Sequence, residues 1–171
     1  MSTTSSTDRR LGYALGEEEG EHFWLLGALA TIKISADDSG GQYCLIDVEM
    51  PAGVGTPWHT HRDEDEWFYV REGAFEVYVG DAHMTLTAGE VAFGPKGIPH
   101  TFMGGPDGGK MLVGCGPKFE GLVREIGDPV PEHVLPPPPE GPPDMDLLLP
   151  IADKWAYDIL GPPGPPPGHS Q

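Results

Sequence analysis

Short alternating strand patterns occupy residues 23–116 of this 171-residue chain, and they constrain its fold more than any other feature. Between residues 74 and 79, for example, Phe75, Val77 and Val79 alternate with more polar side chains. A period of two turns one face of a strand toward a core and the other toward solvent. Glycines, prolines and acidic turns separate the patterns, and no helical periodicity of any length interrupts them. We therefore expect an all-β unit.

The expected strands are short and are joined by tight turns. Gly80-Asp81 is a natural hairpin turn between two of them. The strand patterns cover residues 25–34, 43–50, 66–70, 74–79, 83–86 and 111–116. A chain of this length fits one domain with a proper core and some peripheral segments, which excludes a two-domain arrangement.

The segments outside the strands have their own patterns. Residues 1–20 are expected to be a partly flexible N-terminal arm, and residues 118–127 carry apolar side chains at helical spacing. Prolines make residues 136–149 a stiff, extended connector. Residues 150–161 begin with a proline suited to a first helical turn, so we expect a C-terminal helix there. Residues 162–171 are expected to form a disordered tail.

The charge, the hydrophobic pattern and the cysteines of the chain indicate which partners and which cellular location to expect. A formal charge of -17, uninterrupted by any Lys/Arg cluster, argues against nucleic acid and anionic membranes as partners. No apolar stretch is long enough to span a bilayer and no signal-peptide pattern opens the chain, so we expect a cytoplasmic protein. Cys44 and Cys115 lie in apolar stretches and are expected to be small core residues that could be neighbours in space.

Three histidines have positions that suit one metal ion. His59 and His61 are two residues apart, so on a strand their side chains project the same way. His100 follows Pro95, Gly97 and Pro99, which favour a tight turn leading into a strand. Imidazoles suit transition metals, whereas calcium and magnesium prefer sites made only of oxygen. A single histidine in such a place is more often structural, so the hypothesis depends on the three acting together.

An acidic side chain completes the expected ligand set. Glu66 shares a strand face with Phe68 and Val70, but Glu64 has the same parity, and periodicity alone does not separate them. Glu64 and Asp65 remain reserve candidates. The alternative interpretation is that residues 62–66 are a solvated acidic turn, which is partly true in any case because one site cannot use four acids.

Two segments, residues 53–73 and 89–104, resemble the two signature motifs of the cupin superfamily. The resemblance selects Glu66 as the fourth ligand, because six residues separate it from Gly73 as in the first motif. It also implies a cupin-type double-stranded β-helix, a jelly-roll barrel, over residues 21–135, with short C-terminal helical segments. The chain departs from the pattern at Gly104, where the superfamily often has asparagine, but this is no ligand position.

The resemblance gives candidates for the barrel interior. A closed barrel has no exposed edges and can hold a small ligand. For most of the inward candidates plain core packing is the expected role. They are Ile46, Val48, Phe68, Val70, Phe75, Val77, Phe93 and Phe102.

The flanking segments resemble the single-domain cupins related to quercetin 2,3-dioxygenase, which cleave flavonols. The similar segments are residues 23–27, 32–33, 63–70, 121–127 and 159–163. The resemblance implies that His59, His61, Glu66 and His100 hold one divalent transition metal, which could be iron, nickel, cobalt, manganese, copper or zinc. It further implies dioxygen insertion into a small aromatic or enolic substrate, with Glu66 as a ligand or as the base that accepts the substrate proton.

Other functions are compatible with the same residues. One is a metal-dependent isomerase or cyclase of small metabolites, and another is a small-molecule-binding cupin without catalysis. Oxygen consumption separates the dioxygenase from the isomerase. The resemblance also implies a homodimer.

Overall fold

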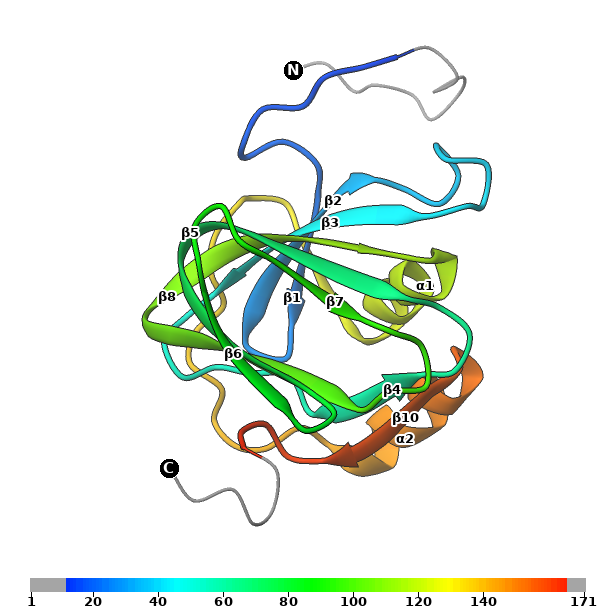
Figure 1. The fold of residues 1–171 in the computed structure, drawn as a ribbon. Helices are drawn as coiled ribbons and strands as arrows, with labels where there is room; N and C mark the ends of the chain where they lie inside the picture. The colour runs from blue at the N-terminus through cyan, green and yellow to red at the C-terminus, as the bar shows by residue number, and fades with distance from the viewer. Residues whose placement is uncertain (1–11, 166–171) are drawn as a thin grey trace.

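The computed structural model describes residues 12–165, which form one curled antiparallel sheet with two short helices against it (Figure 1). The helices are α1 (Pro117–Ile126) and α2 (Met145–Lys154). The strands are β1 (Glu21–Leu25), β2 (Ala28–Ile34), β3 (Cys44–Met50), β4 (Trp58–His61), β5 (Glu66–Val79), β6 (Ala82–Thr87), β7 (Val91–Gly94), β8 (His100–Cys115), β9 (Asp128–Val130) and β10 (Tyr157–Gly161).

The strands curve round a common interior. They follow the order β10-β4-β8-β3-β2-β1-β9, and β5 pairs with β6, β7 and β8. The two long strands β5 and β8 pair along most of their length, from Trp67 opposite Gly114 to Val79 opposite His100. This arrangement confirms the expected all-β jelly-roll barrel. Neither helix in the described part of the chain has the length and apolar character needed to cross a bilayer.

Several strand boundaries differ from the sequence-based expectation. The pattern at residues 25–34 is a hairpin, because Leu26 and Gly27 have positive φ angles and separate β1 from β2. The patterns at 66–70 and 74–79 belong to the single strand β5, whose register shifts near Gly73. A shift of register lets one strand continue through a turn signal, so the glycine marks an irregularity and not a strand end.

Most of the expected inward side chains form the core. Phe68, Val70, Phe75 and Val77 are fully buried. Ile46, Val48 and Phe102 are also buried. The expectation for Phe93 was wrong, since its side chain is 53% exposed. In β7 the buried residues are Ala92 and Gly94, so the alternation of the strand turns Phe93 outward.

The C-terminal segment also differs from the expectation. Helix α2 begins five residues before Pro150, because the side chain of Asp144 accepts hydrogen bonds from the backbone N–H groups of Asp146 and Leu147. The helix ends near Ala156, which has a positive φ angle of 64°. The rest of the segment expected to be helical, Tyr157–Gly161, is strand β10, paired with β4.

The two ends of the described chain pack on the barrel. Lys33 donates hydrogen bonds to the carbonyl oxygens of Gly16, Glu17 and Glu19, which ties the N-terminal arm to the sheet. At the other end, Nε1 of Trp58 donates to the carbonyl oxygen of Gly164 over 2.7 Å. The remaining parts of the expected arm and tail, residues 1–11 and 166–171, lie outside the described residues.

At Gly73 the backbones of β5 and β8 approach each other closely. Its φ is +69°, and an added Cβ would lie 2.3 Å from the carbonyl oxygen of Gly108. We expect Gly73→Ala to lower the free energy of unfolding by about 2–4 kcal/mol, from the left-handed conformation and the close contact together. Gly40→Ala is the matched control, since Gly40 has φ +68° and no atom within 4 Å of an added Cβ. If urea denaturation shows that Gly73→Ala and Gly40→Ala lower the free energy of unfolding equally, the close approach of β5 and β8 at Gly73 is contradicted.

Candidate metal centre

The short strand β4 places two of the predicted ligands. It lies between β10 and β8, and His59 is the register partner of His100 on β8. Because alternate side chains of a strand share a face, His59 and His61 both point into the barrel. Glu66 enters from the start of β5. One donor atom from each of the four side chains lies within 4.8 Å of the other three, so the structure brings together His59, His61, Glu66 and His100.

Each imidazole of this cluster is held through its Nδ1 atom. Nδ1 of His59 donates to the carbonyl oxygen of Pro57 over 2.7 Å, and Nδ1 of His100 donates to that of Ile98 over 2.9 Å. Nδ1 of His61 lies 3.3 Å from Sγ of Cys115. A carbonyl oxygen only accepts, so in His59 and His100 the Nδ1 atom carries a proton and the Nε2 atom faces the cluster.

The acidic member of the cluster is Glu66 and not either reserve candidate. Oε2 of Glu66 is 2.8 Å from Nε2 of His100 and 3.4 Å from Nε2 of His61. The Glu64 carboxylate instead accepts hydrogen bonds from the backbone N–H groups of Lys118 and Phe119 at the start of α1. Asp65 accepts one from the backbone of Lys96. Glu64 also forms a second group of possible donors, with His61 and Cys115.

Burial sets the charge of the cluster. It lowers the pKa of His59 to about 3, helped by the charge of His100, and it lowers the pKa of His61 well below its usual range. Burial also acts to lower the pKa of His100, but the hydrogen bond and charge of Glu66 outweigh it and leave this pKa raised. His59 and His61 are therefore neutral at physiological pH, which is the form that binds a metal.

The donor set fits a divalent transition metal. The relative exposure of each of the four residues is 7% or less, and Nε2 of His61 is buried without a hydrogen-bond partner. A buried polar atom normally has a partner, so the free Nε2 is explained by a ligand at this point. Three imidazoles and one carboxylate favour a transition metal over calcium or magnesium.

An apolar pocket of about 770 Å³ lies near His59, although none of the four cluster residues is among those that line it. Two of its lining residues flank this histidine: Pro57 accepts its hydrogen bond, and Ile159 is its register partner on β10. The proline-rich connector lines the pocket with Pro139, and helix α2 lines it with Leu149. The pocket is therefore assembled from the C-terminal segment and the barrel, and it reaches neighbours of His59 in the sequence and in the sheet.

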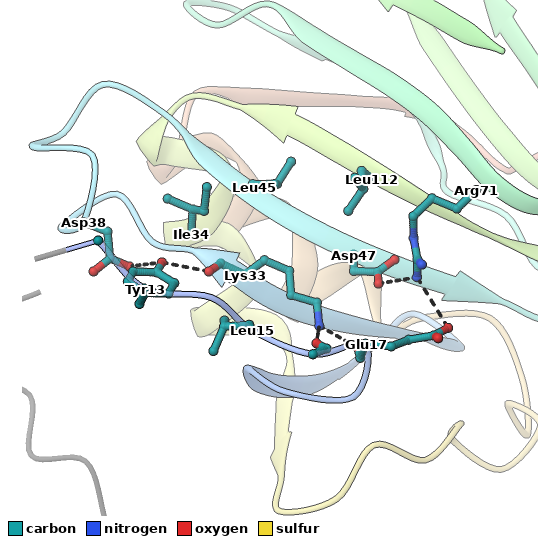
Figure 2. Close-up of a pocket in the computed structure, with 12 residues that line it drawn as sticks. Tyr13, Leu15, Glu17, Lys33, Ile34, Asp38, Leu45, Asp47, Arg71 and Leu112 are labelled. Carbon is teal, nitrogen blue, oxygen red and sulfur yellow. Dashed lines mark hydrogen bonds and ion pairs between the residues drawn. The ribbon is translucent and has the colours of Figure 1, made fainter. Parts of the chain in front are cut away.

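A second hollow, of about 680 Å³, lies on the outer face of the sheet under the N-terminal arm (Figure 2). Its charged side chains pair across it: Nη2 of Arg71 donates to Asp47 over 2.6 Å, and the hydroxyl of Tyr13 donates to the carbonyl oxygen of Lys33. The residues lining it do not include any member of the histidine cluster. It is separate from the candidate metal centre.

Sequence reasoning missed two residues that contact the cluster. The ring of Tyr157 on β10 lies 4.1 Å from that of His61, centroid to centroid, and is buried. Tyr157 and Ile159 alternate with other side chains as in a strand, but the helical pattern that precedes them led us to expect a helix there. Cys115 was expected only as a core residue. It is buried and lies opposite Cys44 in the sheet as expected, but it also contacts His61.

Comparisons with known proteins agree with the observed fold and with the resemblance to the cupin superfamily. Residues 46–112 match the family model described as Cupin domain. Quercetin 2,3-dioxygenase of Bacillus subtilis (strain 168) is 26% identical over 138 residues, which cover 80% of this chain. This chain spans 41% of the length of that relative.

Two solved structures resemble the barrel. A predicted oxalate decarboxylase from Thermotoga maritima has a TM-score of 0.53 at 18% identity, covering 58% of this chain and 93% of that one. An RmlC-like cupin from Shewanella frigidimarina NCIMB 400 has a TM-score of 0.51 at 23% identity, covering 61% of this chain and 89% of that one. At these identities the likeness concerns the fold.

Proposed function

This chain is a member of the cupin superfamily, and from that premise we propose that it is a metal-dependent dioxygenase of a small aromatic or enolic molecule such as a flavonol. The single observation that supports the proposal most is the buried cluster of His59, His61, Glu66 and His100. The similarity to quercetin 2,3-dioxygenase supports the reaction class. In this reaction both atoms of dioxygen enter the flavonol, its central ring opens, and carbon monoxide leaves.

The four residues of the cluster would hold one divalent transition metal, which could be iron, nickel, cobalt, manganese, copper or zinc. A bound metal supplies Lewis-acid stabilisation for the negative charge that develops on an enolic oxygen. The protein contributes three imidazoles whose rings are fixed by Pro57, Ile98 and Cys115, and those of His59 and His61 are neutral. Fixed rings keep the donor atoms in place before a ligand arrives.

Glu66 is the proposed base for the substrate hydroxyl group. Its carboxylate is buried next to Nε2 of His100, at a distance of 2.8 Å. A carboxylate that approaches the substrate hydroxyl can accept its proton. The substrate would thereby become the electron-rich enolate that reacts with dioxygen.

The apolar pocket supports an uncharged, largely apolar substrate. Val54, Leu149 and Ile159 contribute to its lining, and prolines from the connector contribute much of the remainder. A pocket with few polar groups favours a flat aromatic ring over a charged sugar phosphate or a dicarboxylate. Its apolar wall also excludes water from reactive intermediates.

The direct test is turnover of quercetin by protein loaded separately with iron, manganese, cobalt and nickel. We expect loss of the flavonol absorbance together with stoichiometric oxygen uptake with at least one metal, and no loss in metal-free protein. Absence of oxygen uptake with every metal would overturn the proposed activity. Conversion of a substrate without oxygen uptake would identify the isomerase or cyclase in its place.

A further inference from the structure

Cys115 lies behind His61, on the side of the imidazole that faces away from the other cluster residues. Its Sγ atom is 3.3 Å from Nδ1 of His61 and 3.6 Å from Oε2 of Glu64. The cysteine is only 4% exposed, so its partners are protein atoms, which also include the Tyr157 side chain, and not bulk water. The thiol therefore connects a candidate metal ligand with a carboxylate outside the ligand cluster.

Glu64 is itself held in place by helix α1. Its Oε1 atom accepts a hydrogen bond from the backbone N–H of Lys118 over 2.8 Å, and its Oε2 atom accepts one from Phe119 over 3.2 Å. These are free N–H groups of the first helical turn, where a carboxylate is stabilised. A carboxylate only accepts, so the S–H group of Cys115 is the donor in its contact with Glu64.

The direction of this contact decides which nitrogen of His61 carries the proton. A neutral thiol has one proton to donate. When it donates to Glu64, the Nδ1–H of His61 donates to Sγ, and Nε2 keeps a lone pair that faces the cluster. When it donates to His61, the ring carries its proton on Nε2 and is unable to bind a metal there. Nε2 of His61 makes no hydrogen bond, in agreement with the first arrangement.

We propose that Cys115 is a positioning residue that, together with Glu64, fixes the Nδ1–H tautomer of His61 and so prepares Nε2 to bind the metal. This inference rests on the metal centre of the proposed function. His59 and His100 obtain the same tautomer from the backbone carbonyl groups of Pro57 and Ile98, whereas His61 depends on side chains. Partners of this kind commonly change metal affinity about 10–100-fold.

The test compares Cys115→Val, which removes the hydrogen-bonding group, with Cys115→Ser, which keeps one. Imidazole tautomers are measured by nitrogen-15 NMR of the metal-free protein, and Co²⁺ affinity by chelator competition. We expect Cys115→Val to mix the tautomers of His61 and to weaken Co²⁺ binding about 10–100-fold. Cys115→Ser should restore the Nδ1–H tautomer and most of the affinity.

Cys44→Val is the matched control. Cys44 is the register partner of Cys115 on β3 and is equally buried, but its thiol donates to the carbonyl oxygen of Gly116. We expect this variant to keep the tautomer and the affinity of the wild type. Glu64→Ala supplies a second route if Cys115→Val fails to fold, because it removes both carboxylate oxygens, and with them the acceptor of the S–H group, while Cys115 remains.

Two results would overturn the inference. One is a wild-type tautomer and Co²⁺ affinity in Cys115→Val, or in Glu64→Ala where that variant is the one that folds. The other is a thiolate-to-cobalt charge-transfer band in the wild type, which would make Cys115 a ligand. The NMR measurement needs neither metal nor substrate. Absence of quercetin turnover with the expected tautomer changes would therefore reject the proposed function alone.

Discussion

Glu66→Gln is expected to lower flavonol turnover by roughly 10²–10⁴-fold, the usual contribution of a general base. Glutamine keeps the size of the side chain and an oxygen that can face the cluster, but an amide is unable to accept the substrate proton. We therefore expect much of the metal affinity to survive while kcat falls. Steady-state oxygen uptake gives kcat, and chelator competition gives the metal affinity of the same preparation.

Glu72→Gln is the control for this change. Glu72 is on the same strand, β5, and its side chain is 69% exposed in an ion pair with Lys110. Its replacement should leave kcat and metal affinity unaltered. If Glu66→Gln retains full turnover, Glu66 is not the base. If the Glu66 variant loses metal and turnover together, its role is that of a ligand.

His59→Ala is expected to weaken the binding of a divalent transition metal by roughly 10²–10³-fold. Binding of a metal by four protein ligands is worth about 10–16 kcal/mol, which corresponds to about 2.5–4 kcal/mol for each ligand. Titration with Co²⁺ under chelator competition measures the loss. The thermal unfolding of the metal-free variant shows whether the barrel itself remains intact.

His83→Ala is the control for the histidine change. His83 is on β6, with its side chain 46% exposed, and it pairs with Glu76. Removing this histidine should not change Co²⁺ affinity. Unchanged affinity in His59→Ala would contradict the four-residue centre, whereas a loss in both variants would point to binding by scattered surface histidines.

Local spacing was sufficient to predict much of the site. His59 and His61 lie on one strand face because side-chain direction alternates, and His100 reaches them because a proline and glycine turn precedes its strand. Periodicity did not choose between Glu64 and Glu66. The structure separates them, since Glu64 contacts the start of α1 and Glu66 contacts His100.

Sequence patterns did not predict the contacts between distant parts of the chain. The contact of Cys115 with His61 and the pairing of Tyr157 with His61 depend on how strands meet, which no local spacing encodes. The C-terminal helix was misplaced because Pro150 suggested a helix start, whereas the Asp144 cap begins the helix earlier. The homodimer, the metal and the use of dioxygen stay predictions.

The pairing of β10 with β4 has a consequence for how the protein folds. Thr60 and Asp158, in neighbouring strands, are 98 positions apart in the sequence. Contacts with such a separation form slowly, so the histidine-bearing strand lacks one neighbour until residues 157–161 have been synthesised and have docked. An unpaired strand is a template for pairing with other chains. Nascent or truncated chains without β10 should therefore aggregate, even though all four residues of the histidine cluster lie on other strands.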